Sequence, residues 1–122
     1  METTVKILNE MGDTIEVLDS NKVFFIHKGV YNEKLEKDQK YTMCAIREDG
    51  YLKIGIAVCR LDENFVKAKG RNEAARRALE GKWTFPSLTD DPRYTRNLLF
   101  LICEIIDSNF NYFKRTLAKP KQ

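Results

Sequence analysis

The chain has little of the residues that build metal centres and disulfide frameworks. Its 122 residues include one histidine, His27, and three cysteines, Cys44, Cys59 and Cys103, which lie far apart and form no CxxC pair. Zinc in proteins usually takes four Cys or His ligands, and an odd number of separated cysteines is typical of reduced thiols. We therefore predict no metal site, no cofactor and no disulfide.

Long apolar runs are also missing. No stretch approaches the ~18 apolar residues that a membrane-spanning helix needs, and the first residues lack the basic start and apolar core of a secretory signal. Hydrophobic residues make up 43% of the chain and charged residues 32%, with a net charge of +3. This balance predicts one compact cytoplasmic domain over residues 1–122.

The sequence contains no nucleophile elbow, phosphate loop or HExxH motif. His27 cannot be paired from the sequence with a particular cysteine or serine as a catalytic dyad. The acidic pair Asp90-Asp91 precedes Pro92, which is better explained by a helix cap than by a metal site. We therefore predict that the protein is not an enzyme and has no catalytic residues.

The first half of the chain has the patterns of β-strands. Asp49-Gly50 is a typical hairpin turn, whereas residues 29–40 are polar and charge-rich, which indicates a surface loop or a short frayed helix. Apolar and polar residues alternate, or β-branched and aromatic residues gather, in five segments. These predicted strands are residues 3–8, 14–18, 23–28, 41–47 and 51–60.

The fifth predicted strand has two different faces. One face is apolar, and the other carries small residues at Gly55, Ala57 and Cys59. Small residues in a strand allow a backbone or a ligand to approach closely. We favour a packed helix over a ligand cleft, and residues 72–80 supply one with three alanines on a single face.

Two helices are predicted in the second half. The first begins with Asn72 as its N-cap and ends before Gly81, a residue that adopts positive φ easily. The second begins at Asp91-Pro92 and runs to about Thr116. The order predicts an α+β fold, with an N-terminal antiparallel sheet of about five strands in residues 1–60 and two helices in residues 61–122.

The last predicted helix is long and apolar nearly all round, which indicates burial on most sides. A second copy of the chain is the simplest source of the extra cover, so we predict a homo-oligomer. The predicted interface residues are Leu98, Leu99, Ile102, Ile106, Phe110 and Phe113.

Positive charge is concentrated in one stretch, with five basic residues and one acidic residue between positions 67 and 77. Arg76 and Arg77 have i, i+4 partners in Glu80 and Glu73, which is typical of a solvated helix face. The other three basic residues precede the predicted helix start, where free N–H groups favour an anion. Aromatic residues nearby offer stacking for a base. The predicted ligand-binding residues are Phe65, Lys67, Lys69, Arg71, Asn72, Trp83, Arg93 and Arg96.

The segment KGRNEAARRAL, residues 69–79, resembles the last helix of double-stranded-RNA-binding domains. In that family basic residues precede an alanine-rich helix that follows a three-stranded sheet. The family also has a helix ahead of its sheet, and this chain has no predicted helix there. The resemblance implies RNA binding by the basic segment.

A longer resemblance covers Gly55–Leu79 and concerns small phage and prophage proteins. A strand ending in Cys59 is followed by Asp62, Phe65 and Lys67, then by Gly70-Arg71 and, after alanines, by Arg77-Ala78. The pattern is similar to the Thoeris anti-defence family, whose members sequester cyclic ADP-ribose signals. It implies an oligomeric sponge for a phosphate-containing nucleotide, acting in the cytoplasm of a bacterial host.

Three functions therefore compete. Sequestration of a nucleotide near residues 65–71 is the leading prediction, with Arg93 or Arg96 completing the pocket. RNA or DNA binding by residues 67–77 is the second. The third is a protein-binding inhibitor of a host defence system, of the anti-CRISPR or anti-restriction kind, for which the charge is incidental.

Overall fold

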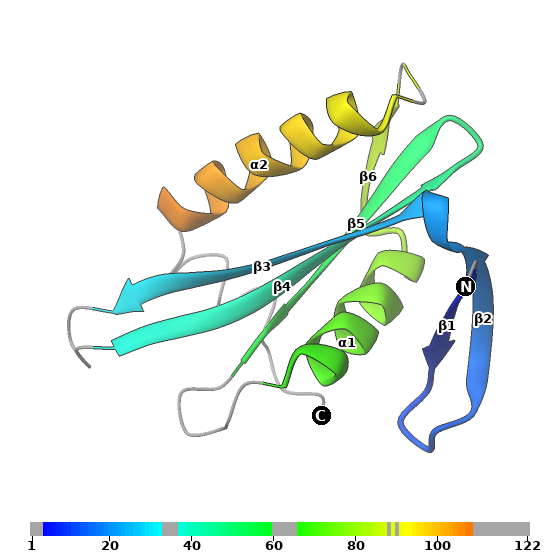
Figure 1. The fold of residues 1–122 in the computed structure, drawn as a ribbon, viewed down its shortest axis with the longest axis horizontal. Helices are drawn as coiled ribbons and strands as arrows, with labels where there is room; N and C mark the ends of the chain where they lie inside the picture. Colours follow the sequence, from blue (N-terminus) through cyan, green and yellow to red (C-terminus); the bar gives the residue numbers. More distant parts are fainter. Residues whose placement is uncertain (1–3, 33–36, 60–65, 88, 90, 109–122) are drawn as a thin grey trace.

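The computed structural model describes residues 4–32, 37–59, 66–87, 89 and 91–108 and has an α+β fold (Figure 1). A short 3₁₀ turn, Ser20–Lys22, separates the second and third strands. The strands are β1 (Thr4–Leu8), β2 (Thr14–Asp19), β3 (Val23–Asn32), β4 (Lys37–Glu48), β5 (Tyr51–Val58) and β6 (Trp83–Pro86), and the helices are α1 (Lys67–Leu79) and α2 (Pro92–Ser108).

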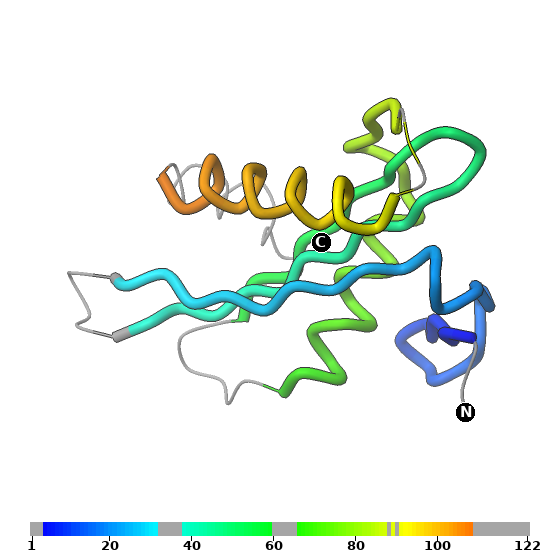
Figure 2. The backbone as a smooth tube through the Cα atoms, turned by 45° about the horizontal axis from the view of Figure 1, so that its top comes forward, coloured from blue at the N-terminus to red at the C-terminus, as the bar shows by residue number. Residues whose placement is uncertain are grey.

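The strands form two antiparallel sheets. β1 and β2 make a separate two-stranded sheet, and the other four form a sheet in the order β3-β4-β5-β6. The two helices lie on opposite faces of this larger sheet (Figures 1 and 2). The prediction of a single sheet of about five strands was therefore wrong in its strand count and in its division.

Each face of the larger sheet has its own core. On β4, Tyr41, Met43 and Ala45 belong to the cluster that Leu99 and Ile106 of α2 complete. The residues between them point the other way. Cys44, Ile46 and Ala57 pack with Ala74, Ala75 and Ala78 of α1 and with Ile7 and Leu18 of the small sheet. The two-residue period of a strand thus divides β4 between two cores.

α1 approaches the sheet very closely at Gly55. A Cβ atom added there would lie within 3.0 Å of the Ala74 carbonyl oxygen, the Ala78 backbone nitrogen and the Arg77 carbonyl carbon. Backbone atoms have no room to retreat within a packed helix, so this position requires glycine. The prediction that the alanine face of the helix packs on the small residues of the fifth strand is confirmed.

Two segments predicted as connections are strands. Most of residues 29–40 extends the β3–β4 hairpin, with Val30 opposite Gln39 and Tyr31 opposite Asp38. Antiparallel pairing satisfies main-chain groups whatever the side chains are, so polar residues can continue a ribbon. β6 was also missed, because its four residues pair with β5 only after α1 has returned the chain to that edge.

The helix boundaries differ from the prediction at one end. α1 begins at Lys67 after Val66, which makes no side-chain cap, so Asn72 lies inside the helix and the predicted N-cap was wrong. At the other end Gly81 has φ of +71°, as expected for a residue that ends a helix. Asp91 caps α2, since its Oδ1 accepts a hydrogen bond from the Arg93 amide at 2.9 Å. The predicted end of this helix near Thr116 lies outside the described residues.

Asn72 has a different role, which is to hold the small sheet. Its Oδ1 accepts a hydrogen bond from the Leu8 amide at 2.7 Å, and its Nδ2 donates to the Leu8 carbonyl oxygen at 2.8 Å. Both bonds engage main-chain groups of Leu8 at the end of β1, next to the irregularity in the β1–β2 register. They fix the β1–β2 ribbon against α1.

We predict that Gly55→Ala lowers the free energy of unfolding by about 3 kcal/mol or more, since α1 must move away from the sheet. The smaller unfolded-state entropy of alanine offsets this loss by less than about 1 kcal/mol. Urea unfolding measures the change. Gly29→Ala is the matched control, because the nearest atom to its added Cβ would be 3.5 Å away. Equal stability of the two variants would contradict the contact.

We also predict that Asn72→Ala lowers the free energy of unfolding by about 1–2 kcal/mol, because two hydrogen bonds are lost while helix propensity improves. Hydrogen exchange should become faster in β1 and β2 than in β4. Asn97→Ala, at an exposed position of α2, is the control and should leave exchange in both sheets unchanged.

Candidate functional site

The first turns of α1 carry exposed basic residues with no acidic residue among them. Lys67, Lys69 and Arg71 are all exposed, and no side chain caps the helix start. The first hydrogen bond at this end runs from the Gly70 amide to the Val66 carbonyl oxygen, at 3.0 Å. Cations next to the positive end of a helix dipole are unfavourable by themselves. The positive potential is therefore strong here, and an anion would relieve it.

His27 of β3 lies beside these cations. Its Nδ1 is 2.8 Å from the Thr42 hydroxyl oxygen on β4. Burial lowers the pKa of His27 below its usual value, and the charges of Arg71 and Lys67 lower it further. The imidazole is consequently neutral at pH 7, able to donate or accept a hydrogen bond.

Lys40 of β4 adds a further cation on the same side of the sheet. It pairs with Gly29, two residues beyond the His27–Thr42 pair, so both pairs face α1. An added Cβ at Gly29 would lie 3.6 Å from the Lys40 Nζ, so the lysine extends over the glycine. We call His27, Lys40, Lys67 and Arg71 the basic cluster.

Arg76 and Arg77 serve the fold. The predicted Glu73–Arg77 ion pair is confirmed at 3.4 Å, and Arg77 Nη1 also donates to the Ile56 carbonyl oxygen at 2.7 Å. Arg76 pairs with Glu73 and, at 3.8 Å, with Glu10 in the turn between β1 and β2. The predicted Arg76–Glu80 pair does not form, because the nearer Glu73 holds the guanidinium.

The predicted ligand residues are dispersed. Trp83 follows the C-terminal end of α1 and packs with the core on the α2 side of the sheet. Arg93 and Arg96 are exposed in the first turns of α2, on the face of the sheet opposite α1 (Figure 1). Asn72 is engaged with Leu8, and Phe65 lies outside the described residues. Only Lys67, Lys69 and Arg71 remain together.

The predicted oligomer residues mostly face their own chain. Leu99 and Ile106 are buried, and Leu98 and Ile102 are partly buried against the same core. Phe110 and Phe113 lie outside the described residues. The large apolar side chains that α2 leaves exposed are a different set, which consists of Tyr94, Phe100, Leu101 and Ile105.

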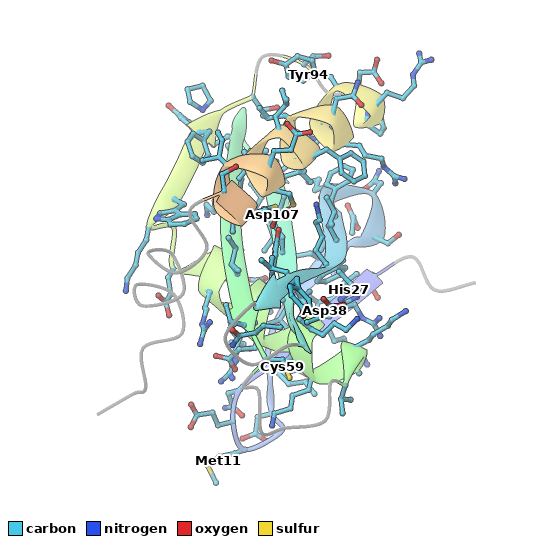
Figure 3. All side chains as sticks on the ribbon, turned by 90° about the vertical axis from the view of Figure 1, so that its left-hand side faces the viewer. Met11, His27, Asp38, Cys59, Tyr94 and Asp107 are labelled. Atoms are coloured by element: carbon cyan, nitrogen blue, oxygen red, sulfur yellow. The ribbon has the colours of Figure 1, made fainter. Side chains whose placement is uncertain are left out.

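A second polar cluster joins the end of α2 to the sheet. Asp107 accepts hydrogen bonds from the Tyr41 hydroxyl at 2.9 Å and from Lys28 Nζ at 2.8 Å. Tyr41 also bonds the Cys103 thiol, and burial raises the pKa of both groups. A protonated thiol is a poor nucleophile, so this cluster stabilises the helix–sheet contact. Figure 3 labels Asp107 and His27, which belong to opposite faces of the sheet.

Cys44 is similarly inert, since burial raises its pKa to about 12. Among the described residues, no group of three His, Cys, Asp or Glu side chains could hold a metal ion. Neither described helix is long and apolar enough to cross a membrane.

Comparison with known proteins adds no relative. No family model, no curated protein and no solved structure matches the chain. The basic cluster must therefore be interpreted from its own geometry. Sequence reasoning found Lys67 and Arg71 from charge density but missed His27 and Lys40. His27 was in a predicted strand and Lys40 in a predicted loop, and only the fold places both on the face of the sheet that α1 covers.

We predict that His27, the only histidine, has a pKa below its ordinary value of 6.5 in the folded protein. Lys67→Ala/Arg71→Ala should raise this pKa but leave it below 6.5, because burial is the larger cause. NMR of the imidazole protons measures both. Lys82→Ala, at the far end of α1, should leave the titration unchanged. The unfolded chain binds the proton more tightly, so stability should decrease as pH falls from 6.5 through the folded pKa. An unshifted His27 pKa would contradict the cluster.

Proposed function

We propose that the chain is a non-enzymatic RNA-binding protein that contacts the phosphate backbone through the basic cluster. The observation that best supports this proposal is the solvent exposure of Lys67 and Arg71. Lys67 and Arg71 are exposed and lie one helical turn apart, with neutral His27 beside them and Lys40 on the same face of the sheet. Regularly spaced phosphates can contact several such groups at once.

The arrangement of elements supports the same proposal. Three antiparallel strands, β3 to β5, are followed directly by an alanine-packed helix whose N-terminal end is basic. This is the part of the double-stranded-RNA-binding fold that residues 69–79 resemble. Such domains recognise the shape of A-form RNA through phosphate and 2′-OH contacts.

The exposure of the basic cluster also weighs against a small-molecule pocket formed by one chain alone. Small-molecule sites usually bury 70–90% or more of a ligand's surface. The residues expected to enclose a nucleotide, Trp83, Arg93 and Arg96, lie away from Lys67 and Arg71 (Figure 1). A ligand at the basic cluster would thus be held on one side, as a polymer backbone is.

Capture of a small nucleotide is the second candidate, and one observation favours it. Two cations one turn apart, beside a neutral His27 bonded to Thr42, match the size of a single phosphate or pyrophosphate. With the Thoeris-like pattern over Gly55–Leu79, this favours a cyclic ADP-ribose-like signal. The protein would then act as a phage anti-defence sponge in the bacterial cytoplasm, with another subunit closing the site.

We predict that the protein binds a fluorescent 16-base-pair RNA duplex with an affinity that falls steeply with salt, because bound phosphates release counterions. Lys67→Ala/Arg71→Ala should weaken binding at least about tenfold and reduce the magnitude of the log–log salt slope by about 2. Anisotropy titrations at several salt concentrations measure both effects.

Arg93→Ala/Arg96→Ala removes the same charge from the other face and is the matched control, expected to bind RNA like the wild type. Cyclic ADP-ribose tests the second candidate, for which we expect a raised melting temperature and a shallow salt slope. An RNA affinity reduced equally by the two double variants would contradict the basic cluster. Failure to bind either ligand would leave the protein-directed inhibitor as the better hypothesis.

A further inference from the structure

The outward surface of α2 carries a row of apolar side chains. Tyr94 is 46% exposed, Leu101 58% and Ile105 56%, and Leu98 between them is partly exposed. We call these four residues the α2 seam. Burying them would remove a large apolar area from water, and exposed apolar side chains in such a row mark an interaction surface.

Apart from Leu98, which also packs against the core at the edge of the seam, the seam is separate from the face that packs on the sheet. At 100° per residue, its four members fall within a 60° sector of the helix surface. Leu99, Cys103 and Ile106, which point into the core, lie at least about 110° away from that sector's centre. Phe100, although 48% exposed, lies on the opposite flank of the helix. The helix thus has one apolar face for its own chain and a second one for another partner.

The spacing of the seam residues allows the seam to pack against a second copy of itself. Its intervals of four, three and four residues are those of alternating d and a positions in a coiled coil. When two such helices pack antiparallel, a positions meet d positions. Tyr94 then meets Ile105 of the partner subunit, and Leu98 meets Leu101 of the partner subunit. All four residues are used, and the contact is the same from both sides, as a two-fold axis requires.

The helix dipoles favour the same direction. Antiparallel packing of two α2 helices opposes their dipoles, whereas parallel packing aligns them.

We propose that a second copy of this chain covers the α2 seam, in a two-fold dimer with antiparallel α2 helices. The contact is modest in size, because 17 residues make a helix only about 25 Å long. Phe85 of β6, 42% exposed, points to the same side of the sheet as α2 because it pairs with Leu52, and it can extend the contact. An interface near the lower size limit predicts weak association, with a Kd of roughly 10 μM to 1 mM.

Light scattering over increasing protein concentration tests the dimer. We expect the wild-type mass to rise toward twice the chain mass, and Leu101→Asp to weaken dimerisation at least tenfold. Phe100→Asp is the matched control, since it places the same charge at an adjacent exposed position on the other flank. Circular dichroism should show folded protein for both variants. Equal dimerisation of the two variants would overturn the proposal.

Spin labels at position 108 test the direction of packing. Ser108→Cys is labelled in a Cys59→Ser background, since Cys44 and Cys103 are buried. Antiparallel helices in the register above place the two labelled positions about 25 Å apart along the axis, whereas parallel helices place them side by side, about 10 Å apart. The short distance would contradict the proposal.

Light scattering and melting measurements would also show whether residues of the same chain cover the α2 seam. If residues of one chain cover the seam, the wild type should remain monomeric at every concentration. Leu101→Asp should then lower the melting temperature more than Phe100→Asp does. That result would overturn the dimer.

Discussion

The close approach of α1 to β5 is the constraint on which the rest of the structure depends. Gly55 lacks the Cβ that would overlap the backbone at Ala74, Arg77 and Ala78. With the alanine face flat against the sheet, little apolar area is buried for each residue, and contact between backbones replaces large side chains. This contact fixes the height and direction of the helix, and Asn72 uses that fixed position to hold the β1–β2 ribbon.

The same constraint produces the charge arrangement at the start of α1. Because Ala74, Ala75 and Ala78 must face the sheet, the basic residues of the preceding turns project outward or toward β3, where Arg71 and Lys67 lower the pKa of His27. Farther along the helix the basic residues are neutralised by Glu73. The cations therefore differ in role along a single helix, and Lys67 and Arg71 of the first turns are the ones that we propose to contact phosphate.

The two helices occupy different faces of the sheet, and this separates the properties of the molecule. The α1 face combines a glycine–alanine contact with a cationic surface. The α2 face has large aliphatic side chains and a polar cluster of Tyr41, Lys28 and Asp107 that anchors the end of the helix. The proposed phosphate contact at α1 and the proposed dimer contact at α2 therefore do not compete for space.

The sequence by itself determined the α+β class, five strands, both helices, the Asp91 cap and the contact between the alanines and the small residues of β5. These follow from local periodicity and from the size of side chains, which act within a few residues. Only the tertiary structure decided that residues 29–32 and 37–40 extend a hairpin, that β6 exists and that Arg93 lies far from Arg71. It also paired His27 with the start of α1. Such features depend on which distant segments meet, and long-range pairing leaves no local pattern in the chain.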